Sequence, residues 1–60
     1  MPMLRVELLS GRTREQKAQF AKEVTNLVSR MLQCPAEAVD VIFVDVDPAD
    51  WAHAGKPYAE

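Results

Sequence analysis

The residue best suited to proton transfer is Pro2, directly after the initiator methionine. When the second residue is small, Met1 is usually removed, which would leave the proline nitrogen as a secondary amine at the chain terminus. Terminal amines titrate at about 7.7–8.0, and burial beside cations lowers that value, so such a base would be poised near neutrality. The ordinary alternative is that Met1-Pro2 is only a common start that precedes a strand.

The second chemically suited residue is Arg12, which follows Gly11 just before a predicted helix. Its planar guanidinium fits a carboxylate, and the amino end of a helix adds a field that favours anions. The alternative is a solvated loop arginine.

Metal and disulfide chemistry have little support in the composition. The chain has one cysteine, Cys34, and one histidine, His53, so it offers no internal disulfide and no Cys/His metal constellation. We therefore expect no metal site built from these residues. Cys34 is expected to be a buried, reduced thiol, and His53 a solvated loop residue.

The first strand and the helix must position these residues. Residues 4–8 alternate apolar and polar side chains, as a strand with one buried face does. Thr13 begins a capping box that Gln16 completes. An apolar stripe then runs for about five turns, until Pro35 ends the helix; its members are Phe20, Val24, Leu27, Val28, Met31 and Leu32.

Residues 39–46 are rich in β-branched side chains and predict a central buried strand. Strand, helix and strand give a right-handed β-α-β unit with parallel strands, a two-layer α/β fold. Asp47 and Pro48 predict a capped single turn, and residues 51–60 a short hairpin or turn near Gly55. We expect Asp45 and Asp47 to be solvated groups at the strand end, and residues 1–60 to form one domain.

Length and charge limit the possible partners. Sixty residues bury so little surface that a monomer would be marginal, and one helix covers only one sheet face, so we expect a homo-oligomer. The formal charge of −2 offers no basic field for nucleic acid or an anionic membrane, and no apolar run approaches a membrane span. We therefore expect a cytoplasmic protein.

Pro2, the strand after it and residues 11–17 (Gly-Arg-Thr-Arg-Glu-Gln-Lys) resemble the 4-oxalocrotonate tautomerase family over nearly the whole chain. The resemblance implies a cofactor-independent isomerase, used in aromatic catabolism, that catalyses keto-enol or 1,3-proton transfer on a 2-oxo acid or its enol or dienol. It implies a homohexamer, a trimer of dimers in which paired units form a four-stranded sheet with two helices. Pro2 would be the catalytic base, and Arg12 would hold a substrate carboxylate in a neighbour's site. Trp51 would wall the pocket or anchor an interface.

Asp40 departs from this family, which keeps a second substrate-binding arginine at the matching position. Three interpretations stay open. Asp40 is a surface acid without a role, it pairs with Arg5 or a neighbour's arginine, or it activates water as in hydrating and dehalogenating relatives. The alternatives to a tautomerase are therefore a hydratase that uses Asp40 and Pro2, or a catalytically silent oligomeric partner.

Overall fold

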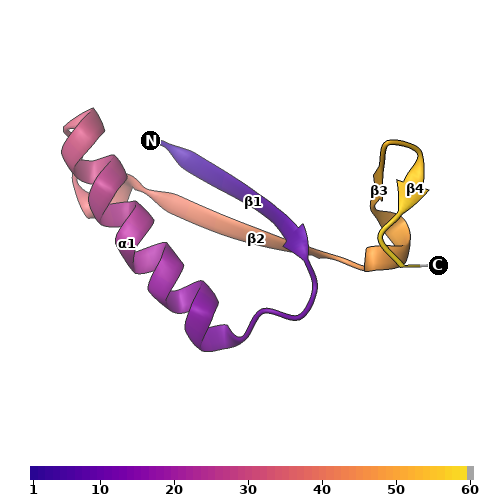
Figure 1. The fold of residues 1–60 in the computed structure, drawn as a ribbon. Coiled ribbons are helices and arrows are strands. Elements are labelled where there is room, and N and C mark those ends of the chain that lie inside the picture. Colours follow the sequence, from indigo (N-terminus) through magenta and orange to yellow (C-terminus); the bar gives the residue numbers. More distant parts are fainter. Residues whose placement is uncertain (60) are drawn as a thin grey trace.

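The computed structural model describes residues 1–59, which form a β-α-β unit followed by a small hairpin (Figure 1). Strands β1 and β2 pair in parallel and α1 joins them, which confirms the predicted topology. The hairpin strands β3 and β4 are antiparallel, and two short 3-10 turns, η1 and η2, flank β2. The elements are β1 (Met3–Leu9), α1 (Arg14–Leu32), η1 (Ala36–Ala38), β2 (Asp40–Val46), η2 (Pro48–Asp50), β3 (Ala52–His53) and β4 (Lys56–Pro57).

The ends of α1 are fixed by local hydrogen bonds. The predicted capping box is present, because the Gln16 amide donates to Thr13 Oγ1 at 3.1 Å and the Thr13 amide donates to Gln16 Oε1 at 2.9 Å. At the other end Gln33 adopts a left-handed conformation with φ 53° and donates to the Ser29 carbonyl. The helix therefore stops at Leu32, earlier than Pro35 alone requires, because the left-handed turn at Gln33 has already closed it.

Helix α1 covers one face of the two-stranded sheet and leaves the other face bare. Phe20 of α1 meets Phe43 of β2 edge to face, with ring centroids 6.0 Å apart. Because side chains alternate along a strand, Val6, which pairs with Phe43, shares this covered face. The bare face carries the residues of the other parity, which are Met3, Arg5, Glu7, Leu9, Asp40, Ile42, Val44 and Val46.

The isolated chain lacks an enclosed core. None of the described residues is fully buried, and the exposed surface is 4864 Å², against about 3,900 Å² for a compact monomer of this mass. The radius of gyration is 14.3 Å, against about 10 Å for a compact domain of this length. The predicted apolar stripe is only partly covered, since Leu27 keeps 46% and Met31 67% of its surface exposed. Two strands are too narrow to cover the whole stripe.

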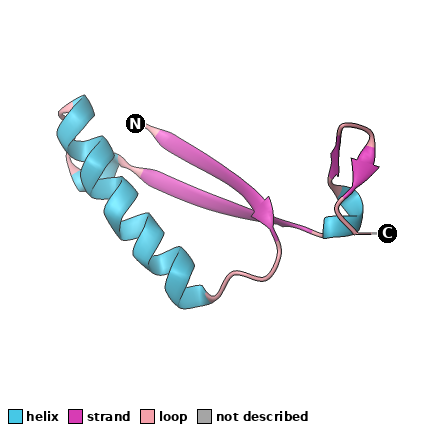
Figure 2. Ribbon diagram, in the orientation of Figure 1, coloured by secondary structure: helices cyan, strands magenta, loops and turns pink. Residues whose placement is uncertain are grey.

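The hairpin stands away from the helix, beyond the carboxyl end of β2 (Figures 1 and 2). Asp47 caps η2 by accepting from the Ala49 amide at 2.9 Å, which confirms the predicted capped turn. Ala54 and Gly55 have φ values of 54° and 83° and close the hairpin at the predicted place. An alanine therefore occupies a left-handed position that glycine would adopt with less strain.

Candidate active site

Pro2 directly precedes β1, and its carbonyl fixes it to the neighbouring strand. The Asp40 amide donates to the Pro2 carbonyl oxygen at 3.0 Å. Pro2 is half-buried, whereas Met1 is 90% exposed. Removal of Met1 would therefore cost almost no packing, and it would leave this hydrogen bond intact because the bond does not use the proline nitrogen.

Asp40 is exposed on the bare face of the sheet, next to Met3 in the register. One interpretation pairs Asp40 with Arg5, but in the structure Arg5 pairs with Glu7 instead. Arg5 Nε lies 3.0 Å from Glu7 Oε2 on the same strand. Among the described residues, Asp40 has no ion-pair partner.

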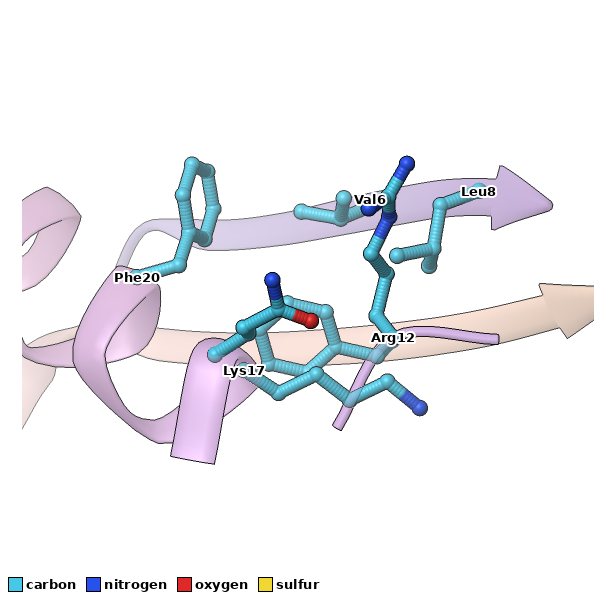
Figure 3. A pocket seen from close by; sticks show the side chains of 7 residues that line it. Val6, Leu8, Arg12, Lys17 and Phe20 are labelled. Atoms are coloured by element: carbon cyan, nitrogen blue, oxygen red, sulfur yellow. The ribbon is translucent and has the colours of Figure 1, made fainter. Parts of the chain in front are cut away.

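Arg12 lies in the loop before α1 and borders a cleft of about 270 Å³ between the helix and the sheet (Figure 3). Figure 3 shows its side chain extended toward β1, where Val6 and Leu8 also line the cleft. Within residues 1–59, its guanidinium makes no hydrogen bond or ion pair. The arginine therefore keeps its full capacity to bind an anion, beside apolar side chains. The lining residues are Val6, Leu8, Arg12, Gln16, Lys17, Phe20 and Phe43.

Asp45 is exposed, as expected of a solvated group near the strand end, and it also has a partner that the sequence does not predict. Its Oδ2 accepts a hydrogen bond from Lys17 Nζ at 2.6 Å. Asp45 therefore lies on the helix side of the sheet, whereas Asp40 lies on the bare side. The pair neutralises Lys17 at the cleft, which leaves Arg12 as the cleft's unpaired cation among the described residues.

Trp51 is half-buried and belongs to a cluster of rings on the hairpin. Its ring centroid lies 6.0 Å from that of Tyr58, and the Tyr58 amide donates to the Trp51 carbonyl at 2.9 Å. His53, expected as a solvated loop residue, lies in β3 and stacks on Tyr58 at 6.4 Å with an interplanar angle of 4°. Tyr58 was not singled out from the sequence, where only its place beyond the Gly55 turn connects it with Trp51.

The four residues proposed from the sequence fall into two pairs at opposite ends of the sheet. Pro2 and Asp40 lie where both parallel strands begin, and Arg12 and Trp51 follow their carboxyl ends. Strand β1 between them has seven residues, a length of about 20 Å or more. One chain therefore does not bring Pro2 and Arg12 to a common small ligand.

Two further findings concern residues 1–59 only. This part of the chain contains no group of three His, Cys, Asp or Glu side chains placed to hold a metal ion. Its helices are also not long and apolar enough to cross a membrane.

Comparison with known proteins gives consistent matches along the chain. A protein-family model described as tautomerase enzyme matches residues 2–60. A probable tautomerase of Streptococcus mutans is 46% identical over 56 residues, which cover 93% of this chain and 92% of the relative.

Solved structures agree with the sequence matches. A 4-oxalocrotonate tautomerase homologue superposes with a TM-score of 0.94 and 37% identity, and the match covers 100% of this chain and 95% of the other. A heterohexamer 4-oxalocrotonate tautomerase from Chloroflexus aurantiacus gives a TM-score of 0.94 at 33% identity, covering 100% and 97% of the two chains.

Proposed function

The chain belongs to the tautomerase family and is an isomerase of that superfamily, and on this premise we propose that the Pro2 nitrogen, freed by removal of Met1, is its catalytic base. The reaction is a 1,3-proton transfer between a 2-oxo acid and its enol. The amine takes the hydroxyl proton of the enol, the oxygen electrons re-form the carbonyl, and the displaced carbon–carbon π electrons take a proton from the ammonium. No group is gained or lost.

The chemical requirement for this role is a free amine. With Met1 attached, the Pro2 nitrogen is part of an amide and does not accept a proton at neutral pH. After removal it is a secondary amine, and such terminal groups titrate at about 7.7–8.0 in reference peptides. A base in this range exchanges protons efficiently near neutrality. The Asp40 amide, which holds the Pro2 carbonyl at 3.0 Å, would fix the position of the ring.

Arg12 from a second copy completes the proposed site. Because Pro2 and Arg12 lie at opposite ends of β1, a neighbour that runs antiparallel would place its Arg12 beside this Pro2. The unpaired guanidinium would then hold the substrate carboxylate through two parallel hydrogen bonds. This arrangement supports a site shared between subunits.

Trp51 is proposed as the apolar wall of the same shared site. It lies at the Arg12 end of the chain and would travel with Arg12 to the neighbour's Pro2. An indole beside the amine would exclude water and disfavour the charged ammonium form. The alternative role, an anchor in the subunit interface, agrees equally with its half-buried position on the hairpin.

The assembly that we propose is a homohexamer built from dimers with four-stranded sheets. The bare sheet face, the uncovered side chains of α1 and the excess of exposed surface all support burial by further copies. The relative from Chloroflexus aurantiacus is a heterohexamer. The comparisons do not favour the two alternatives raised by Asp40, a hydratase and a catalytically silent partner. A cytoplasmic location belongs to the same proposal.

The observation that carries this proposal is the placement of Arg12, unpaired among the described residues, at one end of the sheet and of Pro2 at the other. The test is turnover of Pro2→Ala, which keeps an amino terminus but replaces the secondary amine with a primary one. We expect a loss of about tenfold or more, equivalent to about 1.4 kcal/mol in the barrier. Intact mass must show that Met1 is absent from both proteins. If Pro2→Ala keeps both the wild-type turnover and the wild-type oligomer, a group other than the Pro2 nitrogen is the catalytic base.

A further inference from the structure

We propose that Asp40 makes the active site selective for substrates with one carboxylate and an uncharged group at the end nearest Pro2. This inference rests on the proposed roles of Pro2 and Arg12 and adds the class of substrate. Its basis is the placement of an unpaired carboxyl group beside the base.

The backbone fixes the position of Asp40. Its amide donates to the Pro2 carbonyl at 3.0 Å, and it pairs with Met3 in the parallel register. Neighbouring strands lie about 4.8 Å apart, so the two residues are immediate neighbours. The Asp40 side chain shares the bare face with Met3, the residue after Pro2, so a substrate that reaches the Pro2 nitrogen from that face would also meet the Asp40 carboxylate.

The charge of Asp40 is not neutralised within residues 1–59. The nearest cation along the bare face, Arg5, is paired with Glu7 at 3.0 Å, and that pair is exposed. Glu37 of η1, a further exposed acid, precedes the same end of β2. The beginning of the sheet is therefore acidic.

The opposite end of the sheet supplies the cation. Within residues 1–59 Arg12 is unpaired there, whereas Lys17 at the same cleft is bound to Asp45 at 2.6 Å. A shared site made from these two ends contains the Arg12 guanidinium, which binds one substrate carboxylate. It also contains the Asp40 carboxylate, which repels another. A second carboxylate on the substrate would meet the like charge of Asp40, and this repulsion would weaken its binding.

The test compares two enols that differ in carboxylate number, phenylenolpyruvate with one and 2-hydroxymuconate with two. We expect the processed wild-type oligomer to favour phenylenolpyruvate in kcat/KM. Asp40→Asn removes the charge at nearly the same shape and should raise the relative kcat/KM for 2-hydroxymuconate by about tenfold. Asp40→Arg should raise it further. Glu37→Gln, which removes an exposed acid near the same end of the sheet, is the matched control and should change the ratio less.

A binding measurement keeps the inference testable if turnover is slow. Titration calorimetry with hexanoate and adipate, which differ by one carboxylate, should show adipate gaining affinity in Asp40→Asn and hexanoate remaining unchanged. An equal ratio in wild type, Asp40→Asn and Asp40→Arg would overturn the role of Asp40. If Pro2→Ala loses turnover while the Asp40 variants leave the ratios unchanged, the role of Pro2 stands and only the selectivity fails.

Discussion

The Asp40 amide donates a hydrogen bond to the Pro2 carbonyl at 3.0 Å, which joins the residue of the proposed base to the acidic residue at the start of β2. The bond uses only backbone atoms, so it is independent of both side chains. Substitutions at either position therefore change the chemistry of the site without removing this link between β1 and β2.

A shared site predicts complementation between two inactive variants. Pro2→Ala keeps Arg12, and Arg12→Ala keeps Pro2, and each alone should lose turnover by about tenfold or more. Subunits unfolded and refolded together at equal amounts should regain about a quarter of wild-type turnover, because random assembly pairs an intact Pro2 with a neighbour's intact Arg12 at that frequency. Turnover measured before and after mixing checks this.

The control for the mixing experiment is refolding of each variant alone, which should give no recovery. Wild-type turnover in either variant would contradict its catalytic role. If mixed oligomers of normal size regain no turnover, the site is not shared between chains.

A charge on the bare sheet face should prevent assembly. Ile42 is 39% exposed in the isolated chain and lies on the face that we expect a second copy to cover. Ile42→Glu would bury an unpaired carboxylate there, at a cost of several kcal/mol. Sedimentation should show species smaller than the wild-type oligomer. Circular dichroism should show less secondary structure, because none of residues 1–59 is fully buried within its own chain.

Lys22→Glu, a charge reversal on an exposed position of α1, is the matched control and should leave the oligomer unchanged. A wild-type chain that sediments as a stable monomer at micromolar concentration would contradict the whole account of assembly.

The hairpin turn contains a position at which glycine should be better than the native residue. Ala54 has φ 54°, a conformation that costs an L residue about 1–2 kcal/mol. A glycine would remove this strain, but the larger entropy of its unfolded chain would cancel part of the gain. Ala54→Gly should therefore raise the thermal midpoint slightly. Gly55→Ala, at φ 83°, should lower it. The opposite order of the two midpoints would show that the turn has another conformation.

The sequence predicts the local elements well because their signals are local. The capping box of Thr13 and Gln16 and the apolar β-branched run of β2 each lie within a few residues of the element they define. The parallel topology then follows from the crossover rule.

The ion pairs between side chains are harder to predict from the sequence. Arg5 bonds Glu7 rather than Asp40, and Asp45 bonds Lys17 from 28 residues away, because such pairs depend on sheet register and on the way the helix lies over it. The separation of Pro2 from Arg12 also follows from the whole fold. The roles of Pro2, Arg12, Trp51 and Asp40 stay predictions, since they depend on neighbours that one chain does not supply.

The most direct test of the central claim compares one protein with and without Met1. Protein made with a methionine aminopeptidase inhibitor present should retain Met1, as intact mass will show, and its Pro2 nitrogen remains an amide. We predict that this form has at least about tenfold lower turnover of phenylenolpyruvate, and that treatment with the aminopeptidase restores turnover in proportion to the methionine removed. Equal turnover of the two forms, in oligomers of the same size, would contradict the role of Pro2 as the catalytic base.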